Sequence, residues 1–334
     1  MTILNPADPR SPLTPPPARR ALNALRGQGA LWALLALILF ASLRYDGFLS
    51  LYNASSFFRY NSMFLLIGIG MTFVIVTGGI DLSVGSVAAM SSVLAALASP
   101  HGAVAGLLAG LAGGLAVGLL NGVLISRLRI EPFIITLGTF LGARGVAQLT
   151  SGQAAVSVDS GSAFAFLGQG DLLGVPVPVV FLLAALALGG VLLNATRFGR
   201  SALGVGDNED AARLMGLKVD AVKVGVYALS GLLAGLAGVI LAAQFGAGQP
   251  VEGVGWELTA IAGVVVGGTL LSGGRGSLFN TMVGVTLLGL VFNILNFENG
   301  KGIISIDVFW QNVIRGAFLL VVVVLQARSA RRTP

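Results

Sequence analysis

Long apolar stretches alternate with short polar segments along almost the whole chain. Each stretch comes close to the ~20 residues that a helix needs to cross the ~30 Å hydrocarbon core of a bilayer. Backbone polar groups in lipid must be paired within a segment or in a closed barrel, and continuous apolar runs fit helices rather than alternating barrel strands. The pattern therefore predicts an all-α polytopic membrane protein with about ten transmembrane helices. The expected spans cover residues 30–43, 62–78, 82–98, 103–125, 133–150, 178–195, 224–243, 257–272, 277–296 and 309–326.

The composition agrees with lipid as the main solvent. The chain has 334 residues and is 55% hydrophobic but only 10% charged, whereas an average soluble domain has about 25% charged residues. Cysteine is absent and His101 is the single histidine. This excludes disulfides, thiolate chemistry and a histidine metal site, and no cofactor is expected on the chain. The net charge of +6 comes from basic residues beside the apolar runs, which is typical of membrane topology and not of nucleic-acid binding.

The basic residues also predict the orientation. If the N-terminus is cytoplasmic, the expected outer segments hold only Arg44, Arg59 and Lys301 of the 20 Lys and Arg residues. Nearly all the others fall in the expected inner segments, and such an excess marks the cytoplasmic side. Both termini are therefore expected in the cytoplasm.

The domain organisation follows from the same reading. Residues 1–28 are rich in proline and are expected to form a disordered cytoplasmic tail, with a cleaved signal over 1–45 as the competing interpretation. Residues 29–327 form the transmembrane domain, and 328–334 a basic cytoplasmic tail.

The longest inner segment, residues 196–223, contains the signals of a short helix. Asp207 or Asn208 is suited to cap its N-terminus, and Gly216 is suited to the left-handed conformation that ends it. A helix of about eight residues is marginal in water, so tertiary contacts or a partner protein must hold it.

The surface of this short helix has a mixed character. Glu209 and Asp210 lie in the first turn, where acidic side chains are favourable, and Arg213 and Leu214 follow. This mixture is expected of an element that faces a partner. The alternative is a solvated loop that merely connects two spans.

Asp81 lies between two apolar runs in the sequence TGGIDLSVGS, residues 77–86. An unpaired carboxylate in lipid costs several kcal/mol, so Asp81 needs a role. It can cap the next helix by accepting from backbone N–H groups near Ser83 and Val84. Alternatively, the break at Gly78 and Gly79 lines a solute path, and Asp81 and Ser83 act as a gate.

Further polar residues fall inside the predicted spans. Asn121, Gln148 and Asn293 are candidates to line a path, although amides also hold helices together. Arg144 and Arg315 need a partner, water or a route to the headgroups.

Glycine-rich stretches recur within the spans as GLLAGLAGG, residues 106–114, and GLLAGLAGV, residues 231–239. Glycine and alanine at four-residue spacing let helix backbones approach closely in lipid, so both stretches are expected to be packing faces. None supplies the lysine of a phosphate-binding loop, and any use of ATP must come from another polypeptide.

Several long motifs together resemble the membrane permease subunits of bacterial ATP-binding-cassette importers for monosaccharides of the ribose, xylose and galactofuranose type. The motifs, in chain order, are GGIDLSVGSVAAMSS (78–92), NGVLISRLRIEPFIITLGT (121–139), TRFGRSALGVGDNEDAARLMGLKVDAVKVGVYALSGLLAGLAGVI (196–240), ELTAIAGVVVGGTLLSGGRGSL (257–278) and WQNVIRGAFLL (310–320). The resemblance covers the chain except the proline-rich tail, and it does not specify the sugar.

The resemblance implies a permease in the bacterial inner (plasma) membrane that pairs with a second permease subunit, identical or related. A cytoplasmic ATPase would use ATP to drive it, and a periplasmic or lipid-anchored sugar-binding protein would deliver the solute. Segment 196–223 then resembles the family's coupling segment. An ion-coupled secondary transporter is the alternative, but it needs intramembrane acids, and the spans offer little beyond Asp81. No constellation typical of an enzyme is visible.

Overall fold

The arrangement in space comes from a computed structural model, which describes residues 28–159, residues 161–300 and the positions 310, 313, 314, 316, 317 and 320. The predicted cytoplasmic tails, apart from residue 28, lie outside the described residues. The same is true of most of the predicted span 309–326, including Gln311 and Arg315.

Helices make up most of the described chain, which confirms the all-α class. Two pairs of two-residue antiparallel strands are the exception among the described residues: β1 (Val156–Ser157) with β4 (Ala247–Gly248), and β2 (Asp171–Leu172) with β3 (Val175–Pro176). The α-helices are α2 (Gly29–Arg44), α3 (Leu51–Val76), α4 (Val84–Ala98), α5 (Ala103–Leu128), α6 (Pro132–Ser151), α7 (Phe166–Gln169), α8 (Val177–Ala195), α9 (Arg197–Asp207), α10 (Glu209–Leu214), α11 (Val219–Phe245), α12 (Trp256–Val266) and α13 (Leu278–Gly300). Two 3₁₀ turns, Ser99–His101 and Ala163–Ala165, complete them.

Seven helices in the described part of the chain are long and apolar enough to cross a membrane. They are α3, α4 with its 3₁₀ extension, α5, α6, α8, α11 and α13. The apolar helices α2 and α12 are shorter, with 16 and 11 residues. The total of about ten spans and the cytoplasmic position of both termini stay predictions.

The predicted span 257–272 is not a continuous helix. Helix α12 ends at Val266, and an irregular segment follows in which Gly268, Gly273 and Gly274 have φ values of +93°, +85° and +76°. L-residues with side chains rarely adopt this left-handed region, which is why glycine stands there. At about 1.5 Å per residue, a helix of this length reaches only about half-way across the hydrocarbon core.

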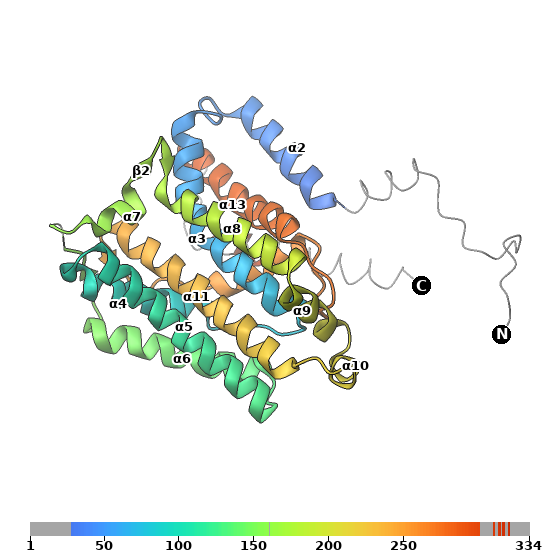
Figure 1. Cartoon of the computed structure of the whole chain (residues 1–334). Coiled ribbons are helices and arrows are strands. Elements are labelled where there is room, and N and C mark those ends of the chain that lie inside the picture. Colours follow the sequence, from blue (N-terminus) through green and yellow to red (C-terminus); the bar gives the residue numbers. More distant parts are fainter. Residues whose placement is uncertain are drawn as a thin grey trace, which may run out of the picture.

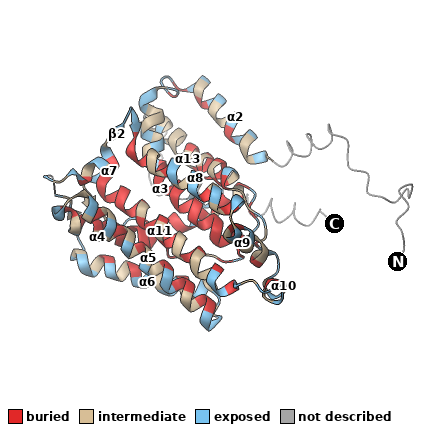
Figure 2. Ribbon diagram, in the orientation of Figure 1, coloured by how far each residue is buried: buried red, intermediate tan, exposed pale blue. Residues whose placement is uncertain are grey.

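Helix α11 forms the centre of the bundle. In Figure 1 it crosses the middle of the molecule, with α4, α5 and α6 on one side and α3 and α8 on the other. Figure 2 shows the buried residues concentrated along α3 and α11, whereas α6 and α10 are mostly exposed or partly buried. The apolar side chains that α6 exposes are those expected to meet lipid.

The two glycine-rich repeats pack against each other. A Cβ added to Gly235 on α11 would lie 2.8 Å from the carbonyl oxygen of Gly110 on α5, and one added to Gly114 would lie 2.7 Å from the Cα of Gly235. Real Cβ atoms do not approach so closely, so only glycine allows these two backbones to touch. The prediction of packing faces is confirmed.

The segments expected on the inner side gather at one end of the bundle. The N–H of Gly274 donates to the carbonyl of Val76 at 2.9 Å, and Gly206 of α9 lies against the same two residues. At the other end, Arg59 of α3 pairs with Asp171 at 2.8 Å. Each end therefore brings together segments that are distant in the sequence.

Candidate functional site

A buried polar network surrounds Asp81, which is only 1% exposed. Its Oδ1 accepts from the backbone N–H of Ser83 at 3.0 Å and from the Ser83 hydroxyl at 2.6 Å, and its Oδ2 accepts from the hydroxyl of Ser230 at 2.8 Å. Gly78, with φ +79°, ends α3, as the sequence predicted, and sets up the irregular turn that carries Asp81. Ser230 belongs to α11, so the network ties this turn to the central helix.

The network continues into two more helices. Asn121 of α5 donates to the Ser83 hydroxyl at 3.0 Å and accepts from the Thr139 hydroxyl of α6 at 2.7 Å. Four separate parts of the chain, the turn before α4 and helices α5, α6 and α11, thus share one chain of hydrogen bonds. Such a network rigidifies a core when every member is satisfied.

The geometry agrees with both roles of Asp81. Acceptance from the Ser83 N–H agrees with a cap before α4, while the discontinuity between α3 and α4 is the kind of break that transporters place along a solute path. Ser230 was missed in the sequence, although a hydroxyl inside the apolar run of α11 is a signal of the same kind as Asn121.

The charged loop has the local structure that its sequence predicts. Asn208, not Asp207, caps α10, because its Oδ1 accepts from the N–H of Ala211 at 2.9 Å. The helix is six residues long, somewhat shorter than expected. Gly216, with φ +82°, ends it in a Schellman arrangement, in which the Gly216 N–H donates to Arg213 and the Leu217 N–H to Ala212, both at 3.0 Å.

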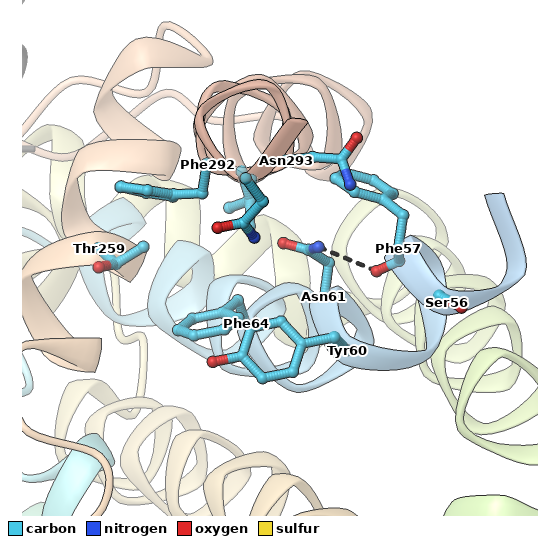
Figure 3. Close-up of a pocket in the computed structure, with 11 residues that line it drawn as sticks. Ser56, Phe57, Tyr60, Asn61, Phe64, Thr259, Phe292 and Asn293 are labelled. Atoms are coloured by element: carbon cyan, nitrogen blue, oxygen red, sulfur yellow. Dashed lines mark hydrogen bonds between the residues drawn. The ribbon is translucent and has the colours of Figure 1, made fainter. Parts of the chain in front are cut away.

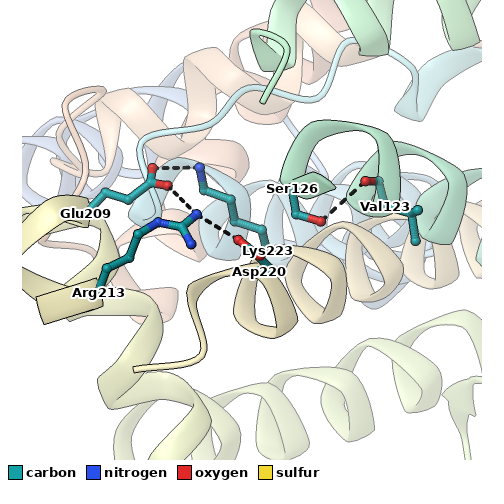
Figure 4. Close-up of polar contacts among 6 residues, drawn as sticks. All are labelled: Val123, Ser126, Glu209, Arg213, Asp220 and Lys223. Atoms are coloured by element: carbon teal, nitrogen blue, oxygen red, sulfur yellow. Dashed lines mark hydrogen bonds and ion pairs between the residues drawn. The ribbon is translucent and has the colours of Figure 1, made fainter. Parts of the chain in front are cut away.

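Two ion pairs hold α10 against the start of α11, and a third lies within α10 (Figure 4). The Arg213 guanidinium lies 3.1 Å from Glu209 and 2.7 Å from Asp220, and the Lys223 ammonium lies 2.6 Å from the other oxygen of Glu209. Partial burial raises the pKa of Glu209, but the hydrogen bonds from Lys223 and Arg213 outweigh it, so the pKa is below its ordinary value. The sequence singled out Glu209 and Arg213 and missed Asp220 and Lys223, whose pairing depends on the turn at Gly216.

Because Arg213 is paired within its own chain, it is not the residue that α10 presents to a partner. Apolar side chains form the outer surface instead. Leu214 is 89% exposed and Met215 is 72% exposed at the tip of the loop, and Asp210 is also exposed. Exposed apolar side chains that are surrounded by charged residues are typical of an interaction site.

A cleft of about 270 Å³ connects the charged loop with the Asp81 turn. Its walls include Thr77 and Gly79 on one side and Glu209 and Lys223 on the other. Tyr227 also lines it, and its hydroxyl donates to the carbonyl of Ile80 at 3.3 Å.

One face of α11 therefore contacts both the charged loop and the Asp81 network. Lys223, Tyr227 and Ser230 follow one another at the four- and three-residue spacing that puts side chains on one side of a helix. They bind Glu209, the Ile80 carbonyl and Asp81 in that order.

A second cavity, of about 350 Å³, lies near the opposite end of the bundle, between α3, α12 and α13 (Figure 3). Asn293, one of the predicted path residues, lines it and exchanges amide hydrogen bonds of 3.1 and 3.4 Å with Asn53. Aromatic rings from Tyr60 and Phe64 lie on the α3 side. The sequence did not identify these rings, because aromatic residues in an apolar helix give no signal that separates a cavity wall from the core.

The remaining predicted residues lie elsewhere. Gln148 is half-buried on α6, more than two turns beyond Thr139, and none of the side-chain hydrogen bonds that the structure gives for the Asp81 network includes it. Arg144, on the same helix, donates to the carbonyls of Pro250 and Glu252 at 2.7 and 2.6 Å. The structure thus supplies the partner that the sequence required for Arg144.

An apolar bundle of membrane-length helices with a charged, exposed loop at one end is the architecture expected of a membrane permease component. Comparison with known proteins agrees: the family described as "Branched-chain amino acid transport system / permease component" matches residues 53–323. The chain belongs to this family of permease components and is a multi-pass protein of the bacterial inner membrane, as its sequence predicted.

Several relatives are similar over most of their length. The ribose import permease RbsC of Bacillus subtilis is 40% identical over 90% of this chain and 93% of its own. RbsC of Escherichia coli is 36% identical over 91% and 95%, and the L-arabinose permease AraH of Escherichia coli is 39% identical over 81% and 82%. No solved structure matches the chain. Nothing in these comparisons supports the ion-coupled alternative.

Proposed function

We propose that the chain is the membrane-spanning permease of an ATP-binding-cassette importer that carries a monosaccharide into a bacterial cell. The names of the similar relatives refer to ribose import and L-arabinose transport, and the similarity covers more than 80% of both members of each pair. The observation that carries the proposal is the tip of α10, where a doubly capped helix, locked by ion pairs, exposes Leu214 and Met215.

The partner that this tip fits is a cytoplasmic ATPase subunit. This chain lacks a phosphate-binding loop, so the work of ATP binding must reach it through a surface contact. An apolar centre with a charged rim is the usual composition of such a contact. Arg127 and Arg129, at the end of α5, lie at the same end of the bundle as α10. This excess of basic residues supports a cytoplasmic orientation for that end.

The other partners belong to the opposite face and to the membrane. A periplasmic or lipid-anchored sugar-binding protein would dock on the end that carries the Arg59–Asp171 pair and the short strand pairs. A second permease subunit, identical or related, would complete the path in the bilayer.

Transport follows an alternating-access scheme in which the permease contributes geometry and no bond chemistry. Movement of α10 is passed to α11 through the Lys223–Glu209 pair. The same face of α11 holds the Ile80 carbonyl and Asp81, so a tilt of α11 displaces the turn between α3 and α4. In this scheme the movement reaches the solute path through the hydrogen-bonded group of Asp81, Ser83 and Asn121.

Vesicle uptake tests the proposal. The purified chain is reconstituted with its ATPase and binding protein, and uptake of labelled ribose and arabinose is measured with ATP inside the compartment that holds the ATPase. We expect uptake that requires ATP and both partners. Uptake by the permease alone, driven by a proton or sodium gradient, would refute it.

A further inference from the structure

The cavity between α3, α12 and α13 has walls of two kinds. On one side, Tyr60, Phe64 and Trp256 form a continuous aromatic row, with ring centroids 5.6 Å apart for the first pair and 4.7 Å apart for the second. Trp256 starts α12 next to the cavity, and Tyr60 and Phe64 line it directly. On the α13 side, Phe292 faces this row across the cavity (Figure 3).

The polar groups of the cavity are amides and hydroxyls. Asn61 donates through its Nδ2 to the carbonyl of Phe57 at 2.9 Å, which fixes the side chain and leaves its Oδ1 turned toward the cavity (Figure 3). Asn293 is held by its reciprocal pair with Asn53. The hydroxyl of Thr259 donates to the Gly255 carbonyl at 3.0 Å, so its oxygen adds an acceptor. Asn296 lines the cavity at an exposed position.

None of the described residues that line this cavity carries a charge. A zwitterionic amino acid would have to leave both its ammonium and its carboxylate without an ionic partner here, at a cost of several kcal/mol for each group. A neutral polyol has no such requirement. Its hydroxyls match amides that can both donate and accept, and the C–H face of its ring matches an aromatic surface.

We infer that this cavity is a binding site for one monosaccharide within the permease, with the sugar ring against the Tyr60–Phe64 wall and its hydroxyls toward Asn61 and Asn293. The inference rests on the proposed function and goes beyond it, since it places the sugar inside a single subunit. The volume of about 350 Å³ falls at the lower end of the ~300–1,000 Å³ range of small-molecule pockets, as a pentose or hexose requires. The site also favours sugars over the branched-chain amino acids in the family's description.

The natural absence of cysteine permits a direct test. Asn296→Cys introduces a single thiol at an exposed position on the cavity wall, and Leu173→Cys, 99% exposed in a loop away from the cavity, is the matched control. The rate of modification by a small methanethiosulfonate is measured on each purified chain in lipid nanodiscs, with ribose, arabinose or leucine added. We expect a pentose at about twice its dissociation constant to slow modification of Asn296→Cys about threefold. Leucine should have no effect, and Leu173→Cys should react at one rate throughout.

A second pair of variants distinguishes a loss of sugar binding to the aromatic wall from a general effect of losing an aromatic ring on α3. In the Asn296→Cys background, Tyr60→Ala removes a ring that lines the cavity, whereas Tyr52→Ala removes an 84% exposed ring on the same helix and outside it. We expect Tyr60→Ala to raise the sugar concentration for half-protection by several-fold, up to about tenfold, and Tyr52→Ala to leave it within about twofold. Equal modification rates with and without sugar would overturn the inference, as would equal effects of the two variants.

The vesicle assay keeps this outcome apart from the proposed function. ATP-dependent sugar uptake without any protection of Asn296→Cys would refute the cavity site and leave the importer intact. Protection by pentoses without ATP-dependent uptake would support the site and refute the importer.

Discussion

Asp81 accepts a hydrogen bond from the hydroxyl of Ser230 at 2.8 Å, although the two residues stand 149 positions apart in the chain. The carboxylate also takes two donors from Ser83, so every contact that the structure gives it comes from a neutral donor. Asp81→Ala would leave these three donors without their acceptor, at about 1–3 kcal/mol for each buried group. We expect a clear fall in the thermal unfolding temperature, measured by fluorescence in detergent.

Asp81→Asn is the matched control for this variant. The amide keeps one acceptor oxygen, and its NH₂ can donate to the Ser230 hydroxyl in place of accepting from it. Its unfolding temperature should stay closer to that of the parent chain. Intact uptake in Asp81→Asn would favour the cap, and loss of uptake in this folded variant would favour the gate. A parent-like unfolding temperature for Asp81→Ala would contradict the structural role of the network.

Glu209 accepts from both Arg213 and Lys223, so Glu209→Gln removes the charge that joins α10 to α11. Exposed ion pairs contribute little to stability, about 0–1 kcal/mol, and the fold should survive. We expect sugar-stimulated ATP hydrolysis by the assembled transporter to fall several-fold. Asp210→Asn is the control, since Asp210 takes part in none of the ion pairs found in the described part of the chain. Equal activity of both variants would remove the coupling role.

The same residue predicts a pH dependence. The pKa of Glu209 is below its ordinary value of 4.5, because the hydrogen bonds from Lys223 and Arg213 exceed the opposing effect of partial burial. The stability that the ionised Glu209 gives to α10 is therefore complete at pH values above its ordinary pKa. This stability is lost as the pH falls through the lowered pKa of the folded protein. Hydrogen exchange of the α10 amides should accelerate in this acidic window beyond the intrinsic pH effect. The Glu209→Gln chain should show no such extra acceleration, and identical profiles for the two chains would contradict the prediction.

Leu214 should contribute to ATPase binding and not to folding, because its side chain is 89% exposed. Burying a leucine in an interface is worth about 1.5–3 kcal/mol, so Leu214→Asp should weaken the complex by about tenfold or more. The measurement is co-purification of the ATPase with the reconstituted permease. Leu173→Asp, at a 99% exposed position near the other end of the bundle, should bind like the parent chain. Normal binding by Leu214→Asp would exclude the tip of α10 from the interface.

Gly114→Ala tests the contact between the two glycine-rich repeats. A Cβ there would lie 2.7 Å from the Cα of Gly235 and even closer to the Gly231 carbonyl, so the helices must separate. Overpacking of this kind costs about 1–3 kcal/mol. Gly138→Ala is the control, since a Cβ at Gly138 on α6 meets no atom within 4 Å. A lower unfolding temperature is expected for Gly114→Ala alone.

Local signals were predictable from the sequence, and contacts between distant segments were not. Asn208 and Gly216 act within a few residues of themselves, so their types predict the cap and the stop of α10. The glycine spacing predicted packing faces on α5 and α11, but nothing in it showed that the two faces meet. The pairing of Asp81 with Ser230 depends on that meeting, which brings α11 against the turn before α4.

The break after α12 shows a further limit. Hydropathy alone extended this span to residue 272, because Val, Leu and Gly are apolar whether or not they are helical. The helix ends at Val266, where Gly267 and Gly268 follow, and Gly267 leaves room for the backbone of Asn280. The cavity of Figure 3 lies beside this short helix. Its lining residues could not be predicted, because hydropathy did not show where the helix ends.

The 27 residues of α11 amount to a rod of about 40 Å at ~1.5 Å per residue, longer than the hydrocarbon core is thick. The rod is fastened near its first turns to α10 and lies flush against α5 where glycines replace side chains. Because glycine places no side chain between the two backbones, a movement of one helix is passed directly to the other. A rotation of a few degrees at one end of a helix this long moves the other end by about 1 Å or more, so a small movement at α10 displaces the opposite end of the bundle.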